Sequence, residues 1–557
     1  MTARMARTVR WHVAALMLMA AARLAPPAHA DEPTQRPAAV SWPASALRSV
    51  RQIAIQHHGR YKPFDSFARE TLQTITGGAR LDREDPVTTV LSILAEPERW
   101  QQVPLVAVPF VPLREPLGMS RKTARISYTD LVATRALMRM LPPIVQKQQQ
   151  DDTLTMLENE TMDLFQRFVA MNALLEQKLE LVPPPTGTSA WLSIAQPEGY
   201  PPAQQREFRT AWDAVLSAAR RHDASALAVN GRHLAELFER ANPSAYPSRW
   251  RRRLEVFYNR SQPFHLARLF YLFACVMFLL HLGKRHATGT GGWIVFAGGA
   301  GLHATGIAMR VILGERPPVS NFFETMLWLP FVAVILAWVL ARLYRARDIG
   351  FAAALLAVIT LTLADAVPLD SSITPVVAVL RSNKWLTIHV LTVVASYGAL
   401  TLAMVLAHIY SGLFLRRHRS RLPAVELLLY RTIQVGVVLL AGGIMLGAVW
   451  ANASWGRYWG WDPKETWALI TLLWFLAVLH GRVAGWTRGV GLAVATIGGF
   501  FLLLMTYYGV SFYLVGLHSY AGGHATPLPL VLVVYLIAET VFLSVVGFTA
   551  LRRRRPA

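Results

Sequence analysis

The sequence has little of two things that soluble proteins commonly use, cysteine and charge. Cys275 is the single cysteine among 557 residues, so a disulfide scaffold and a CxxC thiol-exchange role are both excluded. Charged residues make up 16% of the chain, against about 25% in an average soluble protein. Hydrophobic residues make up 53%, which excludes the disordered and fibrous classes. The remaining class is a membrane protein that crosses the bilayer several times.

Acidic residues are also scarce, since 34 Asp and Glu against 56 Lys and Arg give a formal net charge of +22. Such a charge would suit nucleic acid if it formed one basic face. Most of the surplus instead lies in short loops between apolar segments and at the two termini, which is typical of a membrane topology signal. We therefore expect membrane lipid around the chain and no nucleic-acid partner.

The N-terminus is predicted to be a secretory signal peptide over residues 1–30. Basic residues precede the short apolar run WHVAALMLMAA, and Ala28-His29-Ala30 suits cleavage, with an uncleaved anchor as the alternative. Residues 31–262 are polar and contain no run near the ~18 apolar residues that cross a bilayer. We expect a mostly helical extracytoplasmic domain there, with helices around residues 128–140, 151–181, 203–220 and 224–241.

From residue 263 to residue 557 the sequence predicts an all-α polytopic membrane domain. About nine apolar segments follow one another, at residues 264–282, 292–313, 322–341, 350–367, 385–415, 425–450, 467–486, 489–515 and 527–551. If the first segment enters from outside, the inner loops and C-terminus contain 15 basic residues and the outer loops five. Because basic loops stay in the cytoplasm, this predicts a bacterial cytoplasmic (inner) membrane protein with residues 31–262 outside.

The expected external loop, residues 450–467, is rich in tryptophan. Its sequence, WANASWGRYWGWDPKETW, contains five tryptophans interleaved with two glycines. An interfacial aromatic belt, the simpler explanation, needs only one or two tryptophans at a helix end. Large flat side chains on a backbone with glycines favour a platform for a planar, apolar ligand. We assign Trp455, Trp459 and Trp461 to this platform.

The segment WGRYWGWDPKETW resembles the tryptophan-rich WWD signature of the CcsA/ResC cytochrome c assembly family, the haem-handling part of System II. The similarity covers roughly residues 290–557 and includes the segments RPPVSNFFET (316–325), LTIHVLTVVASYGAL (386–400), LHGR (479–482) and GLHSYAGG (516–523). The segment IAIQHHGRYKPFDSFARETLQTITGG (53–78) resembles a stretch upstream of this core in fused System II proteins. The resemblance implies a function in cytochrome c biogenesis, with haem b as cargo.

Two histidines fall at the expected external face, level with the tryptophan-rich loop. His389 lies about 6 Å inside the fifth segment, and His518 follows the eighth. Both match family motifs, which implies that they are axial ligands of haem iron. His480 lies about 20 Å below that face, and the resemblance implies a transmembrane haem ligand on the entry route. Asp462 belongs to the signature, and a helix N-cap explains it equally well.

The second ligand beside His480 is left open by the sequence. The family usually supplies it from a CcsB/ResB-type partner subunit, and His303 and His281 are the internal alternatives. His408 is expected to be an interfacial residue at the inner face. Among other charged residues, Arg457 and Lys464 are candidates for pairing with haem propionates, although solvated loop charges explain them equally well.

Three residues of the family motif beside the second external loop, Pro317, Asn321 and Glu324, are assigned to structure rather than to chemistry. No catalytic residue is assigned anywhere in the chain. The resemblance implies a component of a holocytochrome c synthase (haem lyase) complex, served by a thiol-reducing system, that presents haem to the CxxCH segment of apocytochrome c.

The alternative is a b-type electron-transfer cytochrome with two bis-His haems. That architecture needs pairs of histidines at matched depths on neighbouring helices. The outer pair satisfies this, but His480 and His408 differ in depth by about 10 Å. A solute transporter is a third hypothesis, and the absence of obvious inverted repeats weakens it.

Overall fold

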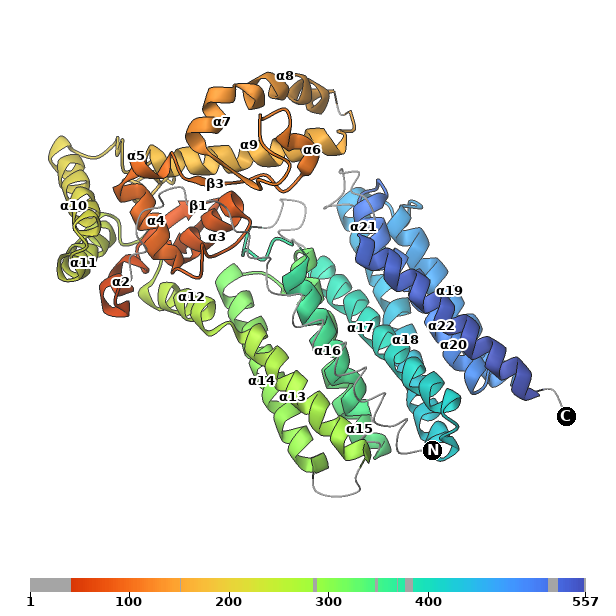
Figure 1. Ribbon diagram of the computed structural model, residues 1–557. Coiled ribbons are helices and arrows are strands. Elements are labelled where there is room, and N and C mark those ends of the chain that lie inside the picture. The colour runs from red at the N-terminus through yellow and green to blue at the C-terminus, as the bar shows by residue number, and fades with distance from the viewer. Residues whose placement is uncertain are drawn as a thin grey trace.

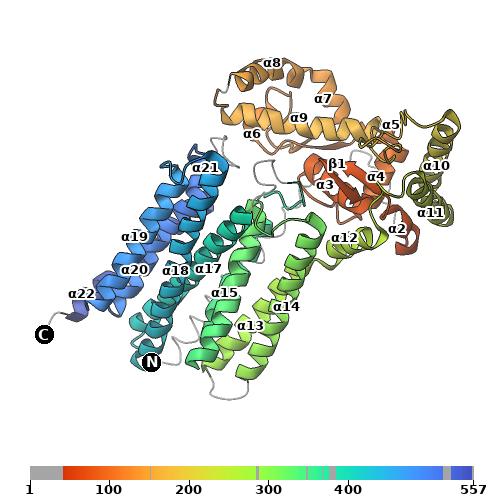
Figure 2. The same ribbon diagram turned by 180° about the vertical axis from the view of Figure 1, so that it is seen from behind.

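The computed structural model describes residues 42–150, 152–283, 288–345, 349–367, 369–375, 384–518 and 529–554. Within them nearly every element is a helix, and the strands are short (Figure 1). An N-terminal region lies against one end of a bundle of long helices, which we call the near end (Figures 1 and 2). The predicted all-α fold is confirmed. Residues 1–30, predicted to be a signal peptide, lie outside the described residues.

The N-terminal region combines helices with two antiparallel hairpins. β1 (Ala54–His57) pairs with β2 (Arg60–Pro63), and β3 (Pro104–Ala107) pairs with β4 (Arg125–Ser127). The helices are α2 (Ala44–Val50), α3 (Phe64–Thr76), α4 (Pro86–Ala95), α5 (Pro97–Trp100), α6 (Val111–Arg114), α7 (Tyr128–Thr134), α8 (Ala136–Gln149), α9 (Met156–Leu175), α10 (Pro202–Arg220), α11 (Ala224–Ala241) and α12 (Arg249–Ser261).

The helices predicted over residues 203–220 and 224–241 are confirmed by α10 and α11, whereas two others differ from the prediction. The helix expected over 128–140 is divided at Arg135, whose left-handed φ of 52° ends α7 and precedes α8. The helix expected over 151–181 begins later, at a capping box between Thr155 and Glu158. It also ends earlier, because Gln177 turns the chain at a φ of 52°.

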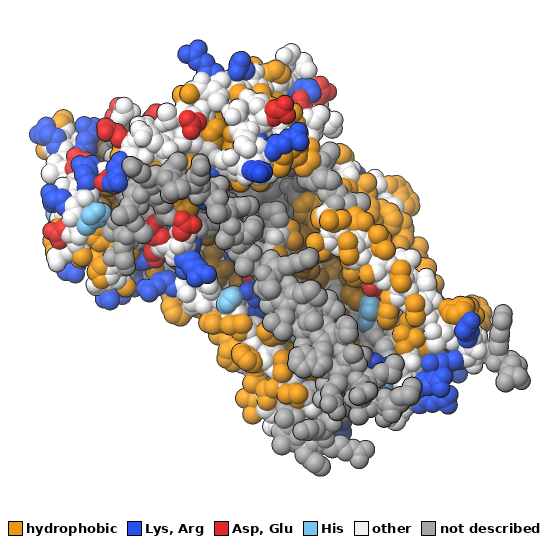
Figure 3. Space-filling view, viewed as in Figure 1, with side chains coloured by type: hydrophobic (Ala, Val, Ile, Leu, Met, Phe, Trp, Pro, Cys, Tyr) orange, Lys and Arg blue, Asp and Glu red, His pale blue; other side chains and the backbone are white. Residues whose placement is uncertain are grey.

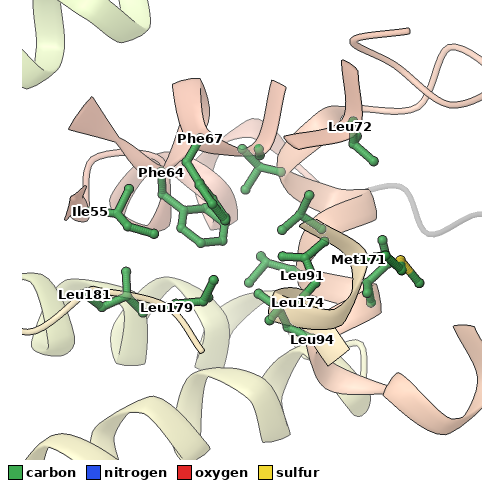
Figure 4. Packing of buried hydrophobic residues seen from close by; sticks show 14 of the residues in the cluster. Ile55, Phe64, Phe67, Leu72, Leu91, Leu94, Met171, Leu174, Leu179 and Leu181 are labelled. Carbon is green, nitrogen blue, oxygen red and sulfur yellow. The ribbon is translucent and has the colours of Figure 1, made fainter. Parts of the chain in front are cut away.

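The core of the N-terminal region forms where the first hairpin meets α3, α4 and α9. Phe64 of α3, Leu91 of α4 and Met171 of α9 are fully buried in one hydrophobic cluster (Figure 4). Burial of a side chain of this size contributes about 1.5–3 kcal/mol. Leu179 and Leu181, which follow α9, belong to the same cluster. The core therefore holds the hairpin in place against three helices.

Nine helices among the described residues are long and apolar enough to cross a membrane, which agrees with the prediction of about nine. The first of these spans includes α12 and continues into α13. The bundle consists of α13 (Pro263–Gly283), α14 (Thr288–Gly314), α15 (Phe322–Tyr344), α16 (Ile349–Ala366), α17 (Lys384–Leu415), α18 (Leu422–Trp455), α19 (Pro463–Val483), α20 (Val490–Leu504), the π-helical turn η3 (Met505–Gly509), α21 (Val510–Tyr513) and α22 (Leu530–Arg554).

The surface agrees with a multi-pass membrane protein. Hydrophobic side chains predominate on the described parts of the bundle that are in view, whereas charged side chains gather over the N-terminal region and at the far end (Figure 3). α17 is the most enclosed of the long helices, and it packs against α15, α18 and α20. Its first turns lie at the near end, so this helix brings its N-terminal residues into the interior next to the N-terminal region.

Ionic and polar contacts join the N-terminal region to the bundle. Arg60 of β2 donates two hydrogen bonds to the carboxylate of Glu255 in α12, at 2.8 and 2.6 Å. Arg310 of α14 donates to the hydroxyl of Tyr258, also in α12, at 3.1 Å. The segment 53–78, which includes β2, thus connects through α12 to the second helix of the bundle.

Candidate functional site

A cavity of about 1160 Å³ lies at the near end of the bundle. Its walls come from the α14–α15 loop, from α17, α18 and α19, and from the segment around η3. His389, His518, Trp459 and Lys464 all line it, so the structure brings together residues that are far apart in the sequence. Ligand pockets commonly measure about 300–1,000 Å³, so this cavity has room for a large cofactor-sized molecule.

His389 lies in the second turn of α17 and is held against α18. Its Nδ1 is 2.7 Å from the backbone oxygen of Gly443. The ring also lies against Gly447, where an added Cβ would come within 2.6 Å of the imidazole Cε1. A glycine at position 447 therefore provides the space that the imidazole fills.

His518 is held by Asp462, the N-cap residue of α19. Nδ1 of His518 is 2.8 Å from Oδ1 of Asp462, which also accepts a hydrogen bond from the backbone N–H of Lys464 at 2.9 Å. Oδ2 accepts from the N–H of Leu517 at 2.6 Å. Burial raises the pKa of the Asp462 carboxyl, but these hydrogen bonds outweigh it and lower the pKa to about 2. The carboxylate is therefore ionised at neutral pH.

Both histidines share one chemical arrangement. In each ring Nδ1 faces an oxygen that can only accept, a backbone carbonyl at His389 and a carboxylate at His518. Nδ1 must therefore carry the hydrogen, and in a neutral ring the lone pair then resides on Nε2. A hydrogen-bonded Nδ1 with a free Nε2 lone pair is the usual arrangement of a metal-bound histidine.

Trp450 and Trp455, which the sequence placed in the loop 450–467, belong to the last turns of α18 and lie against these imidazoles. Trp450 is buried, and its ring centroid lies 6.2 Å from that of His389, with the planes nearly parallel at 10°. It lies 5.9 Å from the His518 ring. Trp455 packs edge-on against His518 with centroids 5.4 Å apart. Trp450 thus lies near both imidazole rings, whereas Trp455 packs against the His518 ring.

The outer part of the tryptophan-rich loop is held by Glu465. Its carboxylate accepts hydrogen bonds from the backbone N–H groups of Gly460 at 2.8 Å and Asp462 at 3.1 Å. Trp461 has a φ of 57° and is 70% exposed, and its ring stands perpendicular to that of Trp459. A left-handed backbone costs a non-glycine residue about 1–2 kcal/mol, and such strain often marks functional sites.

The remaining polar candidates, Lys464, Arg457 and Asn321, each have a different environment. Lys464 lines the cavity, but its Nζ already donates to the hydroxyl of Ser511 at 2.8 Å. Arg457 lies over the Trp455 ring at 5.8 Å. Asn321 caps α15, where its side chain accepts from the N–H of Glu324 at 2.8 Å.

His480 lies on α19 with its side chain exposed on the outside of the bundle, and Nδ1 is 2.7 Å from the backbone oxygen of Leu476. His303 is fully buried, with Nδ1 3.3 Å from the hydroxyl of Tyr271 and Nε2 3.0 Å from the backbone oxygen of Leu327. Both nitrogens of His303 thus have partners inside the bundle. The side chain of His281 lies outside the described residues.

His408, expected to be an interfacial residue, contacts a buried carboxyl group. Its Nε2 is 2.7 Å from Oε1 of Glu539 in α22, and its ring stacks on Phe542 with centroids 5.2 Å apart. Glu539 is 6% exposed. Neither member of this pair lines the cavity. The contact joins α17 to the last described helix.

Three residues at the site are not assigned from the sequence. Trp450, one of the five tryptophans of residues 450–467, packs near both histidines without lining the cavity, whereas Gly447 and Tyr507 line it. Gly447 follows Gly443 by four residues, a spacing of small residues that indicates close approach of another helix. Tyr507 lies in the π-helical turn η3, and its hydroxyl contacts that of Thr325 at 2.7 Å. A π turn leaves no comparable pattern in the sequence.

Comparison with known proteins gives one family. The family described as "Cytochrome C assembly protein" matches residues 319–518, which include the α15 N-cap, His389, the tryptophan-rich loop and His518. "Protein NrfI" of Wolinella succinogenes is 28% identical over 512 residues, and the match covers 84% of this chain. The chain spans only 54% of the length of NrfI.

Shorter relatives match the helical bundle. "Cytochrome c biogenesis protein CcsA" of Prochlorococcus marinus (strain NATL2A) is 32% identical over 240 residues, which are 36% of this chain and 76% of that protein. CcsA of Mesostigma viride is 35% identical over 248 residues, which are 38% of this chain and 80% of that protein.

Proposed function

The chain belongs to the CcsA family of cytochrome c assembly proteins, and we propose that it binds haem b and presents it for covalent attachment to apocytochrome c. Participation in cytochrome c biogenesis follows from the family. The bound haem, the attachment step and the residues that perform it are our proposal. In it, His389 and His518 supply the two axial ligands of the haem iron.

One observation carries this proposal: both cavity histidines are hydrogen-bonded through Nδ1, which leaves the Nε2 lone pair for a metal. Two neutral imidazoles are a common axial pair for haem iron. The cavity volume and the aromatic side chains of Tyr458 and Trp459, which line the cavity, suit a flat, largely apolar macrocycle. Trp455 and Trp461, also assigned to the platform from the sequence, are not among the lining residues. The donor set and the surroundings therefore fit the same ligand.

The attachment chemistry belongs mainly to the haem and the apocytochrome. Each thiol of a CxxCH segment adds across a haem vinyl group, so that one S–C bond and one C–H bond form while the S–H bond and the π bond of the vinyl group break. No electrons are exchanged in this addition, although the thiols must first be reduced by a separate system. The protein contributes by fixing the haem so that its vinyl groups meet the thiols.

His480 is proposed to bind haem on its way to the cavity from the cytoplasmic side. Its position on the outer face of α19 supports a second ligand from another subunit, for which a CcsB/ResB-type protein is the proposed partner. An ionisable residue on a membrane-spanning helix is a functional candidate by default. The near end of the bundle is proposed to face away from the cytoplasm, in the bacterial inner membrane.

The proposal is tested by replacing each cavity histidine with glycine. Haem retained by purified His389→Gly and His518→Gly should fall by about tenfold or more, because each variant loses one axial ligand. Added imidazole should restore part of the haem and part of cytochrome c maturation, since it supplies the missing nitrogen without the tether. The pyridine haemochrome spectrum measures the haem and reports whether it is non-covalent haem b.

His233→Gly, a change at an exposed histidine of α11, is the matched control and should retain all of its haem. Purified wild-type protein that contains no haem would rule out the central claim. Normal haem content in both cavity variants without imidazole would show that these histidines are not the ligands.

A further inference from the structure

A buried group of three charges, Arg310, Arg316 and Glu324, lies beside the cavity, and Arg316 is the member that lines it. Glu324 accepts hydrogen bonds at Oε1 from Arg310, at 2.9 and 3.2 Å, and at Oε2 from Arg316, at 3.0 Å. The backbone N–H of Ser320 donates to Oε2 as well, at 2.9 Å. Two guanidinium groups thus share one carboxylate, so the group carries a formal charge of +1.

Arg310 and Arg316 use their donors differently. The remaining donors of Arg310 bind the hydroxyl of Tyr258 and the backbone oxygens of Ser371 and Ser372, at 3.0–3.3 Å. The side chain of Arg316 is 6% exposed, and its Nε and Nη2 are buried without an acceptor in the described part of the chain. A buried charged donor without a partner is costly, so an acceptor is expected to complete the site.

The position of the open donors defines the kind of acceptor. Arg316 lines the cavity, and Nη1 is already held by Glu324. Nε and Nη2 together form one edge of the guanidinium plane, and that edge binds both oxygens of a carboxylate or phosphate at once. Phe322, Phe323 and Tyr507 line the same cavity, which suits a ligand with an apolar body and an anionic arm.

We propose that Arg316 binds a carboxylate of the cavity ligand through Nε and Nη2. On the proposed function, this carboxylate is a propionate of haem. The sequence offered Arg457 and Lys464 as candidates for that role, with solvated loop charges as an equal alternative. Nζ of Lys464 donates to Ser511 and to the backbone oxygen of Tyr507, and Arg457 is not among the residues that line the cavity. Arg316 would thereby fix the in-plane rotation of the macrocycle, which the two axial histidines leave free.

The test compares haem with its dimethyl ester, which lacks both carboxylates and keeps the iron, the vinyl groups and the ring. Each is titrated into purified protein in detergent, and the Soret band gives the dissociation constant. Wild-type protein should bind haem about tenfold or more tightly than the ester, the usual size of a charge-assisted hydrogen-bonding effect. In Arg316→Met the two ligands should bind alike, with haem weakened to the level of the ester.

Two further variants make the result specific. Arg316→Lys keeps one cation beside Glu324 but lacks the planar pair of donors, so its preference for haem over the ester should be intermediate. This variant also provides the comparison with wild-type protein if Arg316→Met fails to fold. Arg431→Met removes another arginine, on α18 and outside the cavity lining, whose buried Nε has no partner among the described residues. It should keep the full wild-type preference.

The outcomes separate this inference from the proposed function. Wild-type protein with no bis-imidazole Soret spectrum would contradict the proposed function. A wild-type spectrum with an undiminished preference for haem over the ester in Arg316→Met and Arg316→Lys would overturn the role of Arg316 alone. A third arm adds phosphatidylglycerol as a competitor of haem. If the lipid competes in wild-type protein but not in Arg316→Met, and if haem and its ester bind wild-type protein alike, then the ligand of Arg316 is a lipid phosphate. That result would overturn the propionate assignment.

Discussion

Asp462 combines two tasks in one side chain. It caps the N-terminus of α19, and it accepts a hydrogen bond from Nδ1 of His518. A carboxylate is needed only for the second task, because Asn and Asp cap helices about equally well. The negative charge of Asp462 therefore acts on the imidazole of His518. The Nε2 lone pair of that ring becomes more basic when Nδ1–H faces a negative charge.

Asp462→Asn should leave the fold intact and weaken haem binding by about 10–100-fold, the range seen when the partner of a metal-bound histidine is removed. The amide also replaces one accepting oxygen with a donor. An NH₂ group at the Oδ2 position leaves the N–H of Leu517 without its acceptor, whereas one at the Oδ1 position would do so for both Lys464 and His518. The midpoint potential of the haem should rise, because a neutral partner donates less electron density. Soret and redox titrations measure both effects.

Asp223→Asn is the matched control, since Asp223 caps α11 in the N-terminal region and its side chain accepts from Ala226. It should change neither quantity. If Asp462→Asn changes neither the affinity for haem nor the midpoint potential of the haem, then Asp462 acts only as a helix cap.

At the scale of one element, α18 positions His389 through its glycines. Gly443 offers its carbonyl to Nδ1, and Gly447 leaves the space for the ring. The same helix contains Gly442, where an added Cβ would have no atom within 4 Å. α18 therefore provides one glycine that the site requires and another that it does not.

Gly447→Ala should displace the His389 ring and lower haem retention by about tenfold or more, because the new Cβ would lie 2.6 Å from Cε1 and 2.9 Å from Nδ1. Gly442→Ala should retain its haem and gain up to about 1 kcal/mol of helix stability, the usual difference between alanine and glycine. Haem content and thermal unfolding in detergent distinguish the two. Equal haem loss in both variants would show that any added side chain in this part of α18 lowers haem binding, and would contradict a specific effect of Gly447 on His389.

Sequence patterns predicted the long helices well and the details of the cavity only in part. Long apolar runs define a membrane span almost regardless of context, so the count of helices and their approximate limits follow from composition. The levels of His389 and His518 followed from counting residues along their segments. The N-cap function of Asp462 was one of two alternatives, whereas its contact with His518 joins residues 56 positions apart. Such contacts depend on how helices pack, which a single sequence does not encode locally.

Helix ends in the N-terminal region were the least predictable. Arg135 and Gln177 both adopt a positive φ, and neither is a glycine or asparagine that would signal a turn. Tertiary packing of the core overrides local propensity at these positions. The sequence also does not predict that His480 is exposed on the outer face of α19, because a helix that is apolar all round has no polar face that would indicate which side is exposed.

For the whole molecule, the N-terminal region and the cavity lie at the same end of the bundle. The inner loops and C-terminus, with 15 basic residues in the predicted topology, then belong to the far end. Arg316, Lys384 and Lys464, three of the five basic residues counted in the outer loops, line the cavity itself. We therefore propose that the cavity faces away from the cytoplasm, as the charge bias predicts.

That orientation predicts the behaviour of reporter fusions. A reporter fused after Trp455 should score as extracytoplasmic, and one fused after Arg419 should score as cytoplasmic, because these positions lie at opposite ends of α18. Alkaline phosphatase and green fluorescent protein activities give the two readouts. The reverse pattern would put the cavity on the cytoplasmic side and contradict the proposed route of haem.

The contact between His408 and Glu539 also constrains how the chain enters the membrane. α22 carries a carboxyl group into the hydrocarbon, and a charged residue at the centre of a lone helix opposes insertion by about 3 kcal/mol. Burial against α17 and the nearby imidazole would lower that barrier, since the carboxyl group then has a polar partner. The last described helix is thus expected to integrate late, once α17 is already in the bilayer to receive it.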